Sequence, residues 1–180
     1  ADWKRKARKS GVAVGKSSIL LLPLAACGGG GTSVTESATE STASGYIIDG
    51  YISNGFVFQD ANGDGLFDPS EEAFDHTNAV GFFEIIGGSG TFVLDNSQDP
   101  SGAMAIDIAD GQPFSVVMKA PVGSTVVTPL TTLVAEVLEA DSSLSVAQAN
   151  SAITSALGLT GDLTQIDPIA ESNVDVMKAG

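Results

Sequence analysis

The sequence predicts a mainly β fold, a β-sandwich followed by a small C-terminal α-helical segment. Three observations lead to this prediction. Between residues 45 and 128, short runs of β-branched and aromatic residues alternate with turn signals such as Asp49-Gly50 and Asn54-Gly55. After Pro129 the apolar residues recur with helical spacing. The chain has 180 residues, 43% of them hydrophobic, which is enough to enclose a core.

Residues 1–27 have the layout of a signal or anchor segment. A basic cluster within residues 4–9 precedes a short apolar run at residues 19–26, which ends in Leu24-Ala25-Ala26-Cys27. This ending resembles the bacterial lipobox and implies lipidation of Cys27, hence attachment to a membrane. The alternative is an uncleaved anchor or retention segment of a type-I-secreted protein, because an apolar run this short cannot span a bilayer.

Residues 28–44 form a predicted flexible linker that is rich in Gly, Ser and Thr. From Cys27 onward the chain carries 21 of its 22 acidic residues and only two basic ones, Lys119 and Lys178. Such a surface repels nucleic acid and attracts cations, so nucleic acid is excluded as a partner. The single Cys excludes an internal disulfide and a multi-cysteine metal site.

Residues 45–128 contain nine short runs, from which seven or eight strands of the sandwich are expected. Each run is rich in β-branched or aromatic residues and ends near a Gly, Asn or Asp turn. The runs are residues 46–48, 51–53, 56–58, 73–77, 82–86, 91–94, 103–108, 114–119 and 124–127.

Residues 129–180 are predicted to be helical. One apolar face of the first helix consists of Leu130, Leu133, Val134, Val137 and Leu138. The predicted stripe of the second helix consists of Ala147, Ile153 and Leu157. Ser145 is expected to cap the start of that helix and Gly158 to end it. Asp167-Pro168 is the expected start of a third helix running toward Lys178.

The chemistry of the sequence is concentrated in residues 60–71, which match the calcium-loop pattern D-x-[DN]-x-[DN]-G-x5-E. Calcium takes about six to eight hard oxygen ligands, and side chains at positions 1, 3 and 5 of a tight loop converge on one point. Gly65 at position 6 permits the sharp turn. The predicted ligands are Asp60, Asn62, Asp64, the carbonyl of Leu66, Asp68 and Glu71. The alternative is a solvated acidic turn, since Asp, Asn and Gly favour turns in any case.

A true EF-hand would place a helix on each side of this loop. Here the loop is preceded by Phe56-Val57-Phe58 and followed by the strand-like residues 73–77. Two further acidic patterns, near residues 95–99 and 107–111, are interpreted as turns. The sequence therefore predicts one structural calcium ion in a β context.

These motifs resemble those of a known class of modules. Residues 56–71 together with Phe82-Phe83-Glu84-Ile85 resemble the B-type, prealbumin-like repeats of bacterial surface proteins and the carboxypeptidase-regulatory-like modules. Residues 111–134 look like a segment of large bacterial adhesins and cell-surface lipoproteins. The resemblance implies a prealbumin-like or Ig-like sandwich, stiffened by Ca²⁺, that serves as a stalk or spacer at an outer membrane or cell surface, or in a secreted protein.

No catalytic pattern is present in the sequence: it lacks G-x-S-x-G, a phosphate-binding loop and a dinucleotide fingerprint. His76 is interpreted as a surface or packing residue. A Lys119 isopeptide, as in some relatives of these modules, has no further support. We therefore expect a non-enzymatic surface or adhesin module. The alternatives are a subunit of a surface filament or layer, in which the chain self-associates, and a carbohydrate- or partner-binding module of a secreted protein.

Overall fold

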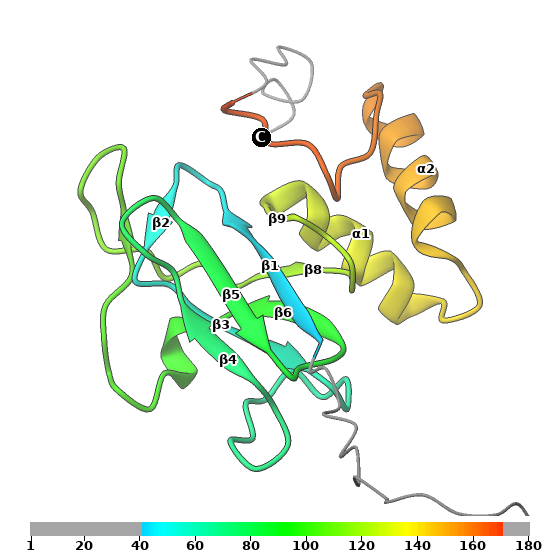
Figure 1. Cartoon of the computed structure of the whole chain (residues 1–180). Coiled ribbons are helices and arrows are strands. Elements are labelled where there is room, and N and C mark those ends of the chain that lie inside the picture. The colour runs from blue at the N-terminus through cyan, green and yellow to red at the C-terminus, as the bar shows by residue number, and fades with distance from the viewer. Residues whose placement is uncertain (1–40, 171–180) are drawn as a thin grey trace, which may run out of the picture. The chain divides into compact units, whose positions relative to one another are not determined.

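The computed structural model describes residues 41–170, and Figure 1 shows their arrangement. This part of the chain is mainly β, as predicted. Its strands are β1 (Thr42–Ile47), β2 (Ile52–Ser53), β3 (Phe56–Asp60), β4 (Phe74–His76), β5 (Phe82–Ile86), β6 (Thr91–Leu94), β7 (Ile106–Asp107), β8 (Met118–Ala120) and β9 (Val126–Val127). Its helices are the 3-10 turn η1 (Asn96–Gln98), α1 (Pro129–Ala140) and α2 (Val146–Leu157). The predicted signal segment, Cys27 and most of the predicted linker lie outside the described residues.

The strands form three sheets, ordered β5-β1-β9, β4-β3-β6-β8 and β2-β7. β1 pairs antiparallel with β5, with Thr42 opposite Ile86, and parallel with β9, with Tyr46 opposite Val126. β1 begins at Thr42, before the expected position, because its first residues already pair with the end of β5. In the four-stranded sheet β3 pairs antiparallel with both β4 and β6, and β6 pairs antiparallel with β8.

One hydrophobic core is built from both larger sheets. Side chains alternate across a strand, so each sheet contributes only the residues of one face. The three-stranded sheet contributes Ile47, Phe83, Ile85 and Val127, and the four-stranded sheet contributes Val57, Phe92, Leu94, Met118 and Ala120. These core side chains are almost fully buried. We call this side of the four-stranded sheet its inner face.

The opposite side of the same sheet, its outer face, carries a second cluster. Phe56, Phe58 and Val93 are also buried, and Phe67 packs against them. Phe67 comes from the connection between β3 and β4 rather than from a strand. Phe56 and Phe58 of β3 are therefore buried, but they lie outside the core between the two larger sheets and beneath a loop.

Both helices begin where their capping residues predict. Thr128 accepts the backbone N–H of Thr131 at the start of α1, and Pro129 occupies the first helical position. Ser145 caps α2 in the same way, and Gly158 ends it with a left-handed φ of 69°. The predicted apolar stripes are only partly buried. Leu130 and Val134 are buried, and Val137, Leu138 and Ile153 pack against them. Leu133 and Leu157 are 42% and 44% exposed, and Ala147 is exposed as well.

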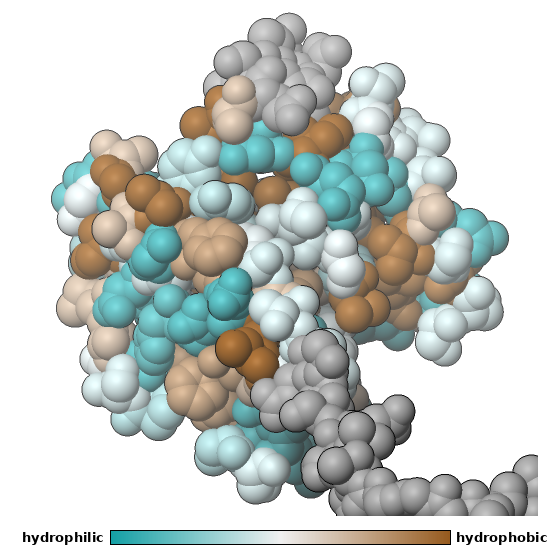
Figure 2. All heavy atoms as spheres, in the orientation of Figure 1, coloured by the Kyte–Doolittle hydropathy of each residue, from teal (hydrophilic) through white to brown (hydrophobic). Residues whose placement is uncertain are grey.

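This difference has a structural cause. α1 packs against both β8 and α2, so its buried side is wide and includes Thr131, whose hydroxyl donates to the carbonyl of Lys119 in β8. Leu133 does not belong to this buried side of α1. Figure 2 shows apolar residues at the surface of the helical region, on the side of the molecule that faces the viewer.

Of the predicted third helix only residues 167–170 are described, and residues 168–170 form a turn. Asp167 Oδ1 accepts the N–H groups of Ile169 and Ala170, both at 2.8 Å, as an N-cap carboxylate does. The residues after Ala170 lie outside the described part. Among residues 41–170, no helix is both long enough and apolar enough to cross a membrane.

Candidate functional site

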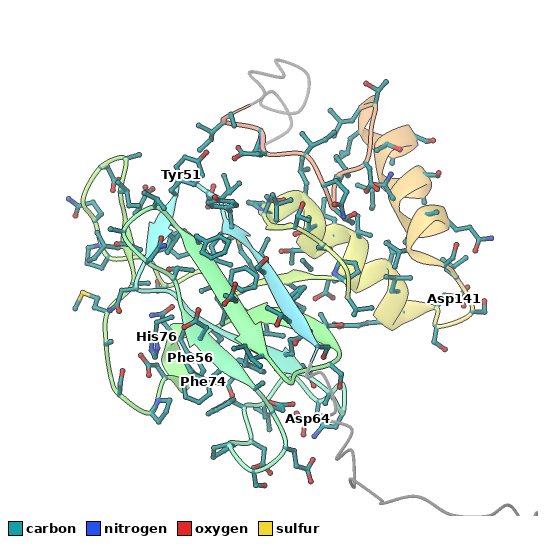
Figure 3. All side chains as sticks on the ribbon, viewed as in Figure 1. Tyr51, Phe56, Asp64, Phe74, His76 and Asp141 are labelled. Carbon is teal, nitrogen blue, oxygen red and sulfur yellow. The ribbon has the colours of Figure 1, made fainter. Side chains whose placement is uncertain are left out.

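The loop with the calcium-like pattern connects β3 to β4 and is called here the acidic loop, residues 60–72. Figure 3 shows Asp64 on this loop, while Phe56, Phe74 and His76 gather beside β4. Gly63 and Gly65 have left-handed φ values of 79° and 73°. A side chain disfavours this conformation, so the glycines allow the two sharp turns. The structure thus places a turn at Gly65, where the calcium pattern requires one.

Asp60 organises the first half of the loop. It ends β3, is only 6% exposed, and accepts the N–H of Gly63 at Oδ1 (2.7 Å) and the N–H of Gly65 at Oδ2 (2.9 Å). Backbone N–H donors pointing at one carboxylate wrap the chain around it. The loop therefore curls around the residue that the sequence places first in the ligand set.

The middle of the loop consists of exposed turns closed by side-chain oxygens. Asn62 Oδ1 accepts the N–H of Asp64 at 2.9 Å, and Asp64 Oδ1 accepts the N–H of Leu66 at 2.8 Å. Asp68 accepts the N–H and the hydroxyl of Ser70, and these hydrogen bonds lower the pKa of Asp68 below its usual range. The oxygens of these side chains remain at the surface.

The two glutamates at the end of the loop differ sharply. Glu71, the predicted ligand, is exposed. Glu72 is only 6% exposed, and its carboxylate accepts the N–H groups of Ala61 and Asp68, both at 3.2 Å. Burial raises the pKa of Glu72, the two N–H bonds oppose that shift, and the nearby charges of Asp60 and Asp64 add to it. The structure turns Glu72, not Glu71, toward the first half of the loop.

Sequence reasoning missed Glu72 because the pattern ends at the first of two adjacent glutamates. One signal was available. Glu72 is followed by β4, in which Phe74 and His76 share a face, so residue 72 falls on that same face of an extended chain. Glu71 lies in the turn that precedes this extended segment.

No basic side chain neutralises the acidic loop within the described residues. Residues 60–72 hold five carboxylates, and the sole Lys or Arg of residues 41–170 is Lys119. Lys119 is occupied elsewhere, at 3.0 Å from Glu136 and 2.9 Å from Glu139. Lys119 therefore forms an ion pair that links β8 to α1. Burial acts to lower the pKa of Lys119, but the two glutamates outweigh it, so the pKa is raised.

Residues 41–170 contain no group of three or more His, Cys, Asp or Glu side chains arranged to hold a metal ion. The predicted oxygen donors all lie in one loop, but those of Asn62, Asp64 and Asp68 are bonded to the loop's own amides. The chemistry of the donor set suits calcium, which prefers carboxylate, amide and carbonyl oxygens. Binding would require these side chains to turn inward.

Phe67 and Gln98 connect the acidic loop to the rest of the sheet. The ring of Phe67 lies 4.9 Å from Phe56, 5.5 Å from Phe58 and 5.2 Å from Phe74, measured between ring centroids. Gln98, in η1, accepts the N–H of Phe67 at 2.7 Å and donates to the carbonyl of Gly65 at 2.9 Å. A loop held at both its backbone and its side chain is anchored over the outer face.

A second polar contact borders the same face. His76 Nε2 lies 3.0 Å from Asp99 Oδ2, whose side chain has no exposed surface. Burial raises the pKa of Asp99, but hydrogen bonds from His76 and Ser101 more than offset it, so the pKa lies below its usual value. The ring of His76 also packs 5.4 Å from that of Phe56. This arrangement is that of a packing residue with a buried partner.

The chain also has a small apolar hollow of about 200 Å³ near the start of α1. Its walls include Ile48, Pro129, Leu130 and Leu163, and Asp49 is the sole ionisable residue among the described residues that line it. It offers no pair of groups for acid–base or nucleophilic chemistry.

Comparison with protein-family models, with curated proteins and with solved structures gave no match to this chain.

Proposed function

We propose that this chain is a non-enzymatic, calcium-stabilised structural or adhesin module of a cell surface, built on a prealbumin-like or Ig-like sandwich. The observation that carries the proposal is the acidic loop: five carboxylates within residues 60–72 have no basic partner among the described residues, and one of them, Glu72, is buried. Carboxylates crowded in this way repel one another, and a divalent cation offsets that repulsion.

The residues that would hold calcium are those of the loop. Asp60 is already fixed by two amides, and Asn62, Asp64, Asp68 and the Leu66 carbonyl follow at the required spacing. We add Glu72 to this set as the carboxylate that closes the site from β4. Calcium would supply positive charge that ties β3 to β4, with a Kd on the order of 10⁻⁴ to 10⁻³ M if the site is of the extracellular type.

Thermal unfolding of the full chain in excess EDTA and in millimolar Ca²⁺ tests the calcium site. At about one hundred times the Kd, a ligand that binds only the folded state stabilises it by about 2.7 kcal/mol, so Tm should rise by several degrees. Asp64→Ala should abolish the rise. Asp110→Ala is the matched control, because Asp110 also accepts a backbone N–H two residues ahead but lies outside the loop. Identical curves with EDTA and Ca²⁺ would contradict the proposal.

The two glutamates give a sharper test of the ligand set. If Glu72 closes the site, Glu72→Gln should remove the calcium-dependent rise in Tm, while Glu71→Gln should retain it. Both variants change one charge by the same amount. The reverse pattern would restore Glu71 as the ligand and reject the assignment of Glu72.

The proposal that the module lies at a cell surface depends on the N-terminal segment. We propose attachment to a membrane through a lipid on Cys27, with the linker keeping the β module away from the bilayer. Labelling of cells with an alkyne-tagged fatty acid should mark the whole chain and not its Cys27→Ser variant. Equal labelling of both, or of neither, would exclude lipidation at Cys27.

A further inference from the structure

The three-stranded sheet has an outward side that remains exposed. We call it the open face, and its residues form three cross-strand pairs of β1 and β5: Thr42 with Ile86, Ser44 with Glu84, and Tyr46 with Phe82. Phe82 is half-buried and the other residues are exposed, in contrast to Phe56 and Phe58 on the outer face of the four-stranded sheet. Aromatic, hydroxyl and carboxylate groups therefore alternate along the open face instead of forming one apolar patch.

Tyr46 is the centre of an aromatic cluster on this face. Its ring lies 5.3 Å from that of Phe82 and 6.2 Å from that of Tyr51, measured between centroids. The planes are inclined to that of Tyr46 by 62° and 61°, respectively. A flat surface therefore cannot lie against all three rings at once, whereas a chain of small units that changes direction can.

Two hollows adjoin at this cluster and make a groove. Their volumes are about 530 and 350 Å³, and Tyr46 and Asp167 line both of them. Tyr51 and Val80 belong to the first hollow, and Gln165 belongs to the second. Small-molecule sites have volumes of about 300–1,000 Å³ and combine aromatic walls with a few fixed polar groups. The groove has both properties.

The polar groups of the groove are held in place by hydrogen bonds. Asp167 Oδ2 accepts the Tyr51 hydroxyl at 2.8 Å. Gln165 Oε1 accepts the Thr125 hydroxyl at 3.2 Å, and its Nε2 donates to the carbonyl of Gly123 at 3.0 Å. A carboxylate or amide oxygen has more than one lone pair, so both oxygens can accept a further hydroxyl from a ligand.

The charge of the groove restricts the ligand. Among the described residues that line it, Asp167 carries a negative charge and none is basic. An anionic ligand would be repelled. A sugar ring meets the remaining requirements in one small unit, because its C–H groups pack on the electron-rich face of an aromatic ring and its hydroxyls donate to carboxylate and amide oxygens.

We infer that the groove at Tyr46 binds a single chain of neutral sugar units. The aromatic rings pack on the sugar faces, and Asp167 and Gln165 accept sugar hydroxyls. This inference adds a ligand to the proposed function and does not rest on the calcium site. Figure 3 shows Tyr51, beside the groove, and Asp64, on the acidic loop, at opposite ends of the β region.

Affinity electrophoresis of the full chain in native gels tests the groove. The gels contain soluble starch, galactomannan or mixed-linkage β-glucan as neutral probes, hyaluronan as an anionic probe, or no polysaccharide. At least one neutral probe should slow the wild-type chain, and hyaluronan should not. Tyr46→Ala should weaken this binding about tenfold. Phe74→Ala is the matched control, because Phe74 is a strand aromatic residue, 45% exposed, outside the groove. It should bind like the wild type.

A second variant, Asp167→Asn, keeps the size of the side chain but removes its charge, and it should also weaken binding. Far-UV circular dichroism checks that each variant is folded. The wild type should bind equally in EDTA and in Ca²⁺ at a temperature where it is folded in both, so the calcium site and the groove can fail separately. Binding that survives both variants would reject the groove. If no neutral probe slows the wild type, the inference is overturned. That includes the case in which Tyr46→Ala abolishes self-association in sedimentation, which would make the open face an interface between copies.

Discussion

The two faces of the four-stranded sheet are buried to similar degrees by different means. On the inner face, Val57, Phe92 and Leu94 pack against strands of the other large sheet. On the outer face, Phe56 and Phe58 are as well buried, but beneath one loop. At the free edge of the same sheet, Lys119 of β8 donates its N–H to the hydroxyl of Thr132 and accepts the hydroxyl of Thr131, both in α1. Burial alone therefore does not tell how a side chain is held.

The difference matters because the partners of the two faces differ in their dependence on solution conditions. Strands that pair through backbone hydrogen bonds keep the inner face covered regardless of ions. The outer face depends on a charged loop, on the His76–Asp99 contact and on ion pairs of Lys119. We expect the inner face to set the stability of the fold and the outer face to set how that stability responds to calcium, acid and salt.

The largest effect is expected on the inner face. Phe92 is 1% exposed and its ring lies 5.3 Å from that of Phe83. Phe92→Ala should cost about 3–5 kcal/mol of unfolding free energy, because it leaves a cavity in a packed core. Urea unfolding should give the same loss with EDTA and with Ca²⁺. A loss that changes with Ca²⁺ would show that the two faces are not independent.

The next effect concerns acid. The pKa of Asp99 is lowered in the folded protein, so its ionised form contributes stability above the unfolded value of about 4, and this contribution is lost as pH falls through the lowered folded pKa. Asp99→Asn should cost about 2–3 kcal/mol at pH 7, since the carboxylate accepts several hydrogen bonds without exposure, and should flatten the stability curve below about pH 4. Asp110→Asn should do neither in the same denaturation series.

A smaller loss is expected when Phe67, the loop residue that packs against Phe56 and Phe58, is truncated. Phe67 is only partly buried, so Phe67→Ala should cost about 1–2 kcal/mol in Ca²⁺, less than Phe92→Ala. In EDTA the loss should shrink, because the loop already contributes less there. Chemical denaturation in both conditions checks this, and an equal loss in both would argue against coupling of the ring to the ion.

The smallest effect on the free energy of unfolding is expected for the ion pairs between Lys119 and α1. Glu136 and Glu139, the partners of Lys119, are about half exposed, and pairs of this kind are worth about 0.2–1 kcal/mol. Lys119→Met should lower the free energy of unfolding by about that amount in low salt and by less in 1 M NaCl, where charges are screened. A loss that persists at high salt would mean that the Lys119 stem, not its charge, holds the helix.

Much of the fold could be predicted from local patterns. The β-rich region, the caps Ser145 and Gly158, and the turn at Gly65 each follow from residues within a few positions of one another. Alternation also showed that Phe56 and Phe58 share a face. It could not show which face, because either side of a strand can be buried and the covering residue, Phe67, lies in a loop.

The candidate site was predicted in the same uneven way. The pattern named Asp60 as a calcium ligand, which stays a prediction, and the structure adds that two loop amides bond to it. The pattern did not indicate the orientation of Glu71 and Glu72. That orientation depends on where β4 pairs with β3, with Phe58 opposite Phe74, which is a tertiary contact. Gln98 and the His76–Asp99 contact join residues more than 20 positions apart, so no local pattern could have indicated them.

The parallel pairing of β1 with β9 affects the order in which the chain can fold. Tyr46 of β1 donates its N–H to the carbonyl of Thr125, and Ile48, just after β1, donates to that of Val127, so β1 pairs with a segment that is synthesised much later. Until β9 is synthesised, β1 can pair with β5 but not with β9. Closing a contact across so many residues is slow, and it leaves one edge of β1 open meanwhile. A chain interrupted before residue 126 would keep that edge open and would be prone to join its neighbours.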